Sequence, residues 1–288
     1  VTSIGPAAFY GCKSLTSVTI PDSVITIGNE AFVECISLTT VTIPNPDCVI
    51  ADNAFDDSVT VIIGKPELTL TIGLVAYYPF NGNANDESGN GNDGNVTGAT
   101  LVADRNGETG KAYYFDGEND RIVSTSDFWP HGNSNRTVSA WFKTSLTIKA
   151  NLFTFGGTSK DGGRFSLMYE PLNSGKQRIV FIGEADDYRF EQNDFNNKWH
   201  NAIITLNNGN GILYLNGEKY GEFEKELKTE KGMPLVIGSS TLVRNNEFYQ
   251  GDLDDIRIYN RALSEAEVAA LYELEKPETT LSTGLVAY

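Results

Sequence analysis

The feature that most constrains the fold is an internal repeat of 23 residues within the first 64 positions. The segment Ile-Gly-x-x-Ala-Phe begins at Ile4 and at Ile27, and a variant of it begins at Ile50. Leu15 and Leu38 lie at equivalent positions in two copies of a Ser-Leu-Thr-x-Val-Thr-Ile-Pro segment. Because a unit this short cannot bury its apolar face alone, such repeats are stable only when they stack as the coils of a solenoid.

Each Val-Thr-Ile segment predicts one short strand, because its residues are β-branched and a proline follows it. The equal spacing predicts that the strands at 16–20 and 39–43 pair in parallel, with equivalent residues in register. The third unit loses a residue near 55–64, which is typical of a closing coil. Cys12 and Cys35 are also equivalent, and we expect them to be stacked core thiols. These segments closely resemble the BspA-like leucine-rich repeats of bacterial surface antigens, over residues 1–64.

A second, longer repeat marks the remaining organisation. Gly-Leu-Val-Ala-Tyr begins at Gly73 and returns at Gly284, and a Lys-Pro-Glu segment precedes each copy. We interpret 65–72 as a linker, 73–275 as a domain, and 276–288 as a second linker with the start of another copy. Further copies of the same domain in a longer chain are therefore expected partners.

Short alternating segments separated by Gly, Asn and Asp fill residues 73–275, which is typical of an antiparallel β-sandwich. Ser264 and Glu267 form a capping box ahead of an apolar segment, which predicts one short C-terminal helix. The predicted fold class is thus mostly β. It combines a short leucine-rich-repeat solenoid with a two-sheet antiparallel β-sandwich of the jelly-roll type.

The domain also resembles a known superfamily. The opening Gly-Leu-Val-Ala-Tyr, the Tyr-Tyr-Phe-Asp-Gly at 113–117 and the Gly-Asp-Leu-Asp-Asp-Ile-Arg-Ile-Tyr-Asn at 251–260 resemble the concanavalin-A-like jelly rolls of the laminin-G and pentraxin type. The resemblance covers 73–274. It implies binding of a carbohydrate or an extracellular protein, one structural calcium ion, and a location outside the cell or at its surface.

Asp254 is the strongest metal-ligand candidate. Strict alternation in the closing strand would place it on the apolar face of Ile256 and Ile258, with Asp255 and Arg257 on the opposite face. A buried carboxylate is costly unless its charge is compensated, and Ca²⁺ is one solution.

The other ligand candidates lie in loops rich in Asn, Asp and Gly. By the family resemblance, Asp86 from the opening loop and Asp254 from the closing strand would share the ion. The alternative is that these loops are ordinary solvated turns. The full candidate set for Ca²⁺ is Asp86, Asn92, Asp116, Asp120 and Asp254.

Three aromatic residues are candidates for ligand binding. Trp129 lies in the polar segment Asp-Phe-Trp-Pro-His-Gly, where its ring could stack on a sugar or a partner, or anchor a folded loop. Tyr188 and Phe190 form a second candidate of the same kind.

Several functions are disfavoured by the sequence. His131 and His200 have no metal-ligand spacing, and no nucleophile, phosphate-loop or dinucleotide motif occurs, so we expect no enzyme activity and no catalytic residue. The net charge of -16 would repel nucleic acid, and no apolar run is long enough to predict membrane insertion. The leading interpretation is a non-catalytic adhesion or ligand-binding module. The alternatives are an accessory carbohydrate-binding region of a larger polysaccharide-degrading enzyme and a structural spacer.

Overall fold

The computed structural model describes most of the chain. The described residues are 1–21, 23–64, 70–126, 128–144, 149–157, 162–183, 187–192, 195, 197–240 and 247–277. They divide into two compact units: Val1–Ile72 with Leu263–Leu274, and Gly73–Ala262 with the residues from Glu275 on. The domain limits at 64, 72 and 275 stay predictions. The second Gly-Leu-Val-Ala-Tyr copy lies outside the described residues.

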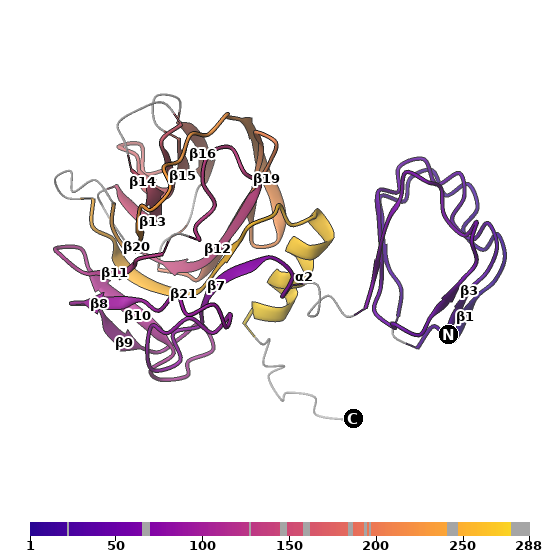
Figure 1. The fold of residues 1–288 in the computed structure, drawn as a ribbon, viewed down its shortest axis with the longest axis horizontal. Coiled ribbons are helices and arrows are strands. Elements are labelled where there is room, and N and C mark those ends of the chain that lie inside the picture. The colour runs from indigo at the N-terminus through magenta and orange to yellow at the C-terminus, as the bar shows by residue number, and fades with distance from the viewer. Residues whose placement is uncertain are drawn as a thin grey trace, which may run out of the picture. The chain divides into compact units, whose positions relative to one another are not determined.

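The repeats form a solenoid with two parallel sheets, drawn in indigo in Figure 1. Val18 pairs with Val41 and Thr26 pairs with Val49, so the predicted parallel register is confirmed. Between the second and third coils, however, Thr40 pairs with Thr60, which is a step of 20 residues. The loss of a single residue from a 23-residue unit would give a longer step. The strands of the two sheets are β1 (Ser3–Ile4), β3 (Thr26–Ile27) and β5 (Val49–Ile50), and β2 (Ser17–Thr19), β4 (Thr40–Ile43) and β6 (Thr60–Ile63).

A column of phenylalanines fills the solenoid core. The ring of Phe32 stacks on Phe9 at 4.9 Å and on Phe55 at 5.1 Å between centroids. These distances match the spacing of neighbouring strands, because each coil contributes one ring at the same repeat position. The prediction that the equivalent cysteines are core thiols is confirmed for Cys35, which is buried. It is wrong for Cys12, which is exposed.

The larger unit is the predicted antiparallel sandwich, and its two sheets have eight and seven strands among the described residues (Figure 1). The larger sheet runs β19 (Glu218–Glu224), β18 (Asn210–Leu215), β17 (His200–Asn207), β12 (Arg136–Lys143), β21 (Gln250–Tyr259), β10 (Ala112–Asp116) and β9 (Thr100–Val102), and β7 (Leu74–Tyr78) also pairs with β21. The other sheet runs β16 (Tyr188–Gln192), β15 (Gln177–Ile182), β14 (Arg164–Pro171), β13 (Ala150–Gly156), β20 (Leu235–Ile237), β11 (Arg121–Ser124) and β8 (Asn95–Thr97).

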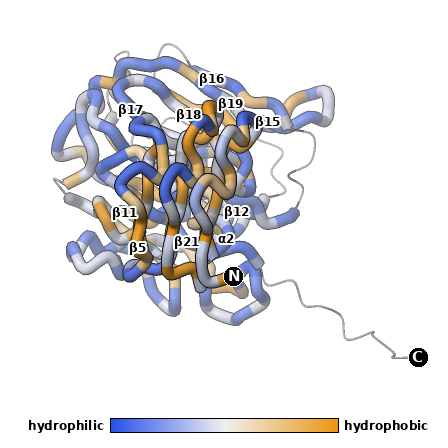
Figure 2. The backbone as a smooth tube through the Cα atoms, turned by 90° about the vertical axis from the view of Figure 1, so that its right-hand side faces the viewer, coloured by the Kyte–Doolittle hydropathy of each residue, from blue (hydrophilic) through white to orange (hydrophobic). Residues whose placement is uncertain are grey.

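The hydrophobic core lies between these two sheets. Val138, Phe142 and Ile204 face it from the larger sheet, and Phe153 and Phe165 face it from the other. Figure 2 shows hydrophobic residues concentrated along the strands and hydrophilic residues along most connecting loops. Burial of these aromatic and branched side chains is the main stabilising contribution to the sandwich.

The predicted C-terminal helix is α2 (Glu265–Glu275). Its capping box is confirmed, because the Ser264 amide donates to the Glu267 carboxylate and the Glu267 amide donates to the Ser264 hydroxyl. Within the described residues, no helix is long and apolar enough to cross a membrane.

Candidate functional site

A β-bulge in β21 determines where the acidic pair points. Ser139 of β12 pairs with Arg257, but Trp141 pairs with Asp254, so one extra residue is inserted in β21. Asp255 occupies the left-handed region, with φ of 42°. A bulge of this kind re-aims side chains and disrupts the strict alternation of a strand.

The predicted orientation of Asp254 is therefore wrong. Asp254 lies opposite Trp141, on the outer face of the sheet, whereas Ile256 and Ile258 lie in the core. Asp255 is also on this outer face and is buried, rather than pointing to solvent. On the other edge of β21, β10 pairs up to Leu253 and β7 pairs from Ile256 on, so the two aspartates lie between the two pairing strands.

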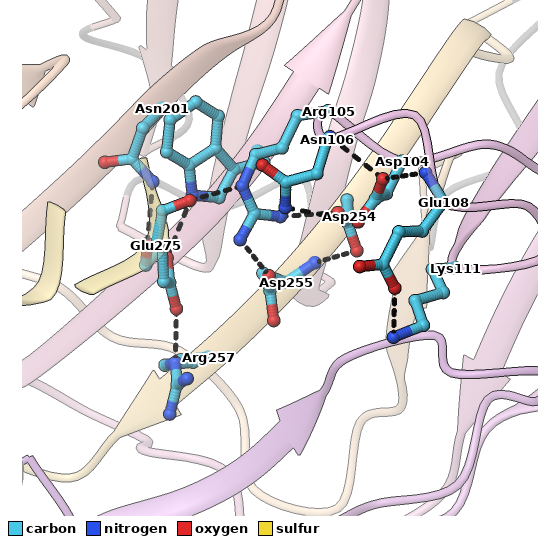
Figure 3. Close-up of polar contacts among 12 residues, drawn as sticks. Asp104, Arg105, Asn106, Glu108, Lys111, Asn201, Asp254, Asp255, Arg257 and Glu275 are labelled. Atoms are coloured by element: carbon cyan, nitrogen blue, oxygen red, sulfur yellow. Dashed lines mark hydrogen bonds and ion pairs between the residues drawn. The ribbon is translucent and has the colours of Figure 1, made fainter. Parts of the chain in front are cut away.

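Arg105 fills the position beside the two aspartates. Its Nη1 donates to Asp254 Oδ2 at 2.5 Å, and its Nη2 lies 2.6 Å from Asp255 Oδ2 (Figure 3). The guanidinium also lies 4.8 Å from the centre of the Trp141 ring. Asp104 Oδ1 accepts from the amides of Asn106 and Glu108, which folds the loop that presents Arg105.

Glu275, the last residue of α2, joins the same cluster. Its carboxylate accepts from Trp141 Nε1 at 2.9 Å and from Arg257 Nε at 2.6 Å, and its carbonyl accepts from Arg105 Nε. We call Arg105, Asp254, Asp255, Arg257 and Glu275 the outer-face network. It holds three carboxylates and two guanidiniums, so one buried negative charge is in excess.

Burial, together with this excess charge, raises the pKa of two carboxylates in the outer-face network. Burial raises the pKa of Asp254 to about 8; the Asp255 charge adds to the shift and Arg105 opposes it. Burial and the Asp255 charge likewise raise the pKa of Glu275 to about 7, against the effect of Arg257. Each carboxylate is buried, where its charged form is disfavoured.

A small polar cleft opens above the network. Its volume is about 130 Å³, and its lining consists of Tyr77, Pro79, Asn81, Asp104, Asn106, Glu108, Lys111, Asp254 and Asp255. Glu108 and Lys111 form an ion pair at its rim. The cleft offers amides and carboxylates to a polar ligand, while the guanidinium of Arg105 holds Asp254 and Asp255 in fixed positions.

Asp86 and Asn92, predicted as calcium ligands, do lie together. Asp86 Oδ1 accepts from the amides of Tyr77 and Ser88, and Oδ2 accepts from the Asn92 amide, each at 2.9 Å. Asn92 Nδ2 donates to the Val75 carbonyl. Three backbone amides already donate to the Asp86 carboxylate. In the structure, Asp86 therefore holds the opening loop against β7. The structure does not bring it to Asp254, whose partners are Arg105 and the Asp255 amide.

Asp116 and Asp120 form a turn between β10 and β11. Asp120 is buried, its Oδ2 accepts from the Asp116 amide at 2.9 Å, and burial raises its pKa. Gly98 makes room for it, since a Cβ at that position would lie 1.8 Å from Asp120 Oδ1. Among the described residues no three His, Cys, Asp or Glu side chains gather as a metal site, and calcium stays a prediction.

Trp129 anchors its loop in the sandwich core, which is the second of the two roles left open for it, and a ligand-binding role stays a prediction. Its side chain is only 5% exposed and belongs to the sandwich core. A large indole is stabilised by burial, and the neighbouring Phe128 is exposed instead, at 72%.

Tyr188 and Phe190 are half-buried and pack at the edge of the sandwich. Their rings lie 5.0 and 6.4 Å from that of Phe223 on β19. The Tyr188 hydroxyl donates to the Glu224 carbonyl, also on β19. The two residues therefore close the edge between the sheets, and a ligand-binding role for them stays a prediction.

Phe128 lies on a pocket that the sequence reasoning missed. The pocket has a volume of about 250 Å³ and is lined by Leu74, Val75, Asn90, Phe128 and Asn260. We call it the Phe128 pocket. Asn90 Nδ2 donates to the carbonyls of Leu74 and Val75, so its amide group is held in one orientation. The signal for this pocket in the sequence is the adjacent pair Phe128 and Trp129. The Trp129 ring enters the core, and the Phe128 ring faces solvent.

Known structures share the sandwich fold. Domain 4 of AbnA, a GH43 extracellular arabinanase from Geobacillus stearothermophilus, in complex with arabinotriose, is similar with TM-score 0.54 and 23% identity, over 69% of this chain and 98% of that one. The binding domain of Paraclostridial Mosquitocidal Protein 1 has TM-score 0.56 and 22% identity, over 70% and 52%. The Botulinum neurotoxin serotype D ligand binding domain in complex with N-acetylneuraminic acid has TM-score 0.55 and 18% identity, over 73% and 53%.

This chain thus spans about half the length of the two toxin domains. At these identities the likeness shows the fold alone. No curated protein matches the chain in sequence.

Two known protein families match the sequence itself. Residues 1–82 match the BspA type leucine rich repeat region, and residues 115–269 match the concanavalin A-like lectin/glucanases superfamily. Both predicted resemblances and their order along the chain are confirmed. The chain belongs to the concanavalin A-like lectin/glucanase superfamily and carries BspA-type leucine-rich repeats ahead of that domain.

Proposed function

We propose that the sandwich is a non-catalytic carbohydrate-binding module of an extracellular or cell-surface protein. The observation that carries the proposal is the Phe128 pocket, in which an exposed aromatic ring lies beside the amide side chains of Asn90 and Asn260. Concave sites that combine apolar surface with a few fixed polar groups are typical of small-ligand binding.

The chemistry of the pocket favours a sugar. The C–H face of a sugar ring stacks on an aromatic ring, and its hydroxyl groups pair with amide donors and acceptors. The pocket, at about 250 Å³, is smaller than sites for drug-sized ligands, which span roughly 300 to 1,000 Å³. A single sugar ring at a chain end fits that scale. The net charge of -16 favours neutral over acidic sugars.

Two of the similar structures support this ligand class, since their names record arabinotriose and N-acetylneuraminic acid as bound molecules. The arabinanase domain also supports the second candidate, an accessory binding region of a secreted polysaccharide-degrading enzyme. Nearly all of that domain, 98%, is covered by this chain. A protein ligand is the competing class, and the binding experiment separates the two.

A structural calcium ion remains part of the proposal only at the β10–β11 turn, where Asp116 and Asp120 would hold it. Among the described residues, one backbone amide donates to the buried Asp120 carboxylate, at 2.9 Å, whereas three donate to the Asp86 carboxylate. Ca²⁺ would supply the missing positive charge. Added Ca²⁺ should raise the melting temperature and a chelator should lower it, and Asp120→Asn should abolish the difference. An unchanged melting curve in chelator contradicts this part.

Binding should be measured by calorimetry with neutral oligosaccharides, including arabinotriose, and with N-acetylneuraminic acid as an acidic comparison. We expect Phe128→Ala to weaken binding of the preferred neutral sugar about tenfold or more. Leu101→Ala is the matched control, because Leu101 is 40% exposed on β9 and is not part of the Phe128 pocket. Equal affinity of Phe128→Ala and the unchanged protein would refute the proposed site, and the absence of binding to any sugar would favour a protein ligand.

A further inference from the structure

We infer that Arg105 supplies from within the chain the cation required by Asp254 and Asp255, so that the outer face of β21 binds no metal ion. The calcium ion expected at Asp254 does not fit the geometry of the outer-face network. The inference is independent of the proposed sugar site.

All four carboxylate oxygens of the acidic pair already have donors. Asp254 Oδ1 accepts from the Asp255 amide at 2.8 Å, and Asp255 Oδ1 accepts from the Tyr77 hydroxyl at 2.6 Å. The two remaining oxygens bind separate nitrogens of the Arg105 guanidinium. A guanidinium matches two carboxylates well, because its planar fork presents several N–H groups in fixed directions.

The surroundings of the guanidinium suit an organic cation and not a metal. One face lies over the Trp141 ring, which attracts a cation but offers no oxygen ligand. Ca²⁺ takes roughly six to eight oxygen ligands, and any ion placed between the aspartates would have to displace Arg105.

Arg105 also joins separate segments of the domain, as a structural metal ion would. Through its three nitrogens it joins the loop before β10, the bulge of β21 and the carbonyl of Glu275. Segments far apart in the sequence are thereby held together at one point, as they would be around a bound ion.

The test is to remove the internal cation and supply Ca²⁺. In Arg105→Gln the acidic pair loses its positive partner, and we expect a new melting-temperature rise of about 5 to 10 °C at a hundredfold excess of Ca²⁺ over its Kd. The rise should be absent from the double variant Arg105→Gln/Asp254→Asn. Any Ca²⁺ response of the unchanged protein should persist in Asp254→Asn and disappear only in Asp120→Asn.

The outcomes are distinct. A folded Arg105→Gln protein that ignores Ca²⁺ would overturn the inference. So would a Ca²⁺ response of the unchanged protein that Asp254→Asn removes, because Asp254 would then be a metal ligand. If Arg105→Gln does not fold, the comparison of the unchanged protein with Asp254→Asn decides, and an identical response to Ca²⁺ and chelator supports Arg105 as the cation.

Discussion

Trp141 and Asp254 lie directly opposite each other on β12 and β21, with the guanidinium of Arg105 packed over the Trp141 ring and bonded to the Asp254 carboxylate. One step along β12, Ala140 faces both Asp255 and Ile256 because of the bulge. The extra residue thus places Asp254 in a buried ionic network, and the excess negative charge there has a measurable consequence.

Stability should fall as the pH rises from about 5 to about 8. The folded-state pKa values of Asp254 and Glu275 are raised to about 8 and about 7, above their ordinary values, so the folded protein binds more protons than the unfolded chain in this range. Their contribution is fully present below the unfolded pKa values and is lost through pH 7 to 8. Urea unfolding at several pH values should show a loss of roughly 1 to 3 kcal/mol.

Asp254→Asn is the control for this pH dependence, because asparagine resembles the protonated aspartic acid and cannot ionise. Its stability should change much less between pH 5 and 8. A free energy of unfolding that rises over this range in the unchanged protein would contradict the charge count of the outer-face network.

The solenoid core predicts a domain-specific effect. Phe32→Ala removes a fully buried ring stacked on both sides, and should cost about 3 to 5 kcal/mol. All three tryptophans lie between 129 and 199, so tryptophan fluorescence reports on the sandwich alone. Circular dichroism should show an earlier transition while the fluorescence transition stays in place. Phe9→Ala, which removes a ring stacked on one side, should cost less, and an equal cost for both would contradict the stacking argument.

Regular repetition is what made much of the fold predictable. The 23-residue step sets the register of Val18 with Val41, and alternating segments with Gly and Asn turns identify the sandwich strands. The predicted orientation of Asp254 is wrong because one inserted residue at Asp255 reverses the alternation of the strand. The sequence does not indicate this bulge, because the residue in the left-handed conformation is not a glycine. Arg105 was missed because the loop that presents it is far from β21 in sequence.

Gly98 should be essential for the Asp120 turn. In Gly98→Ala the new Cβ would lie 1.8 Å from Asp120 Oδ1, in addition to the cost of a positive φ. Gly107→Ala is the matched control, since Gly107 also has a positive φ but open space around its Cβ position. We expect Gly98→Ala to be less stable than the control by at least about 1 kcal/mol in urea unfolding. Equal losses would show that Asp120 moves away without cost.

Phe128 and Trp129 are adjacent, and their substitution should affect different properties of the protein. Trp129→Ala removes a buried core ring and should lower the free energy of unfolding by about 3 to 5 kcal/mol. Phe128→Ala truncates an exposed side chain and should change it by no more than about 0.5 kcal/mol. Urea unfolding followed by circular dichroism gives both values, because the Trp129 substitution alters the fluorescence signal itself. If Phe128→Ala is the more destabilising change, Phe128 is a packing residue, and the loss of sugar binding in that variant could no longer be assigned to a contact with the ligand.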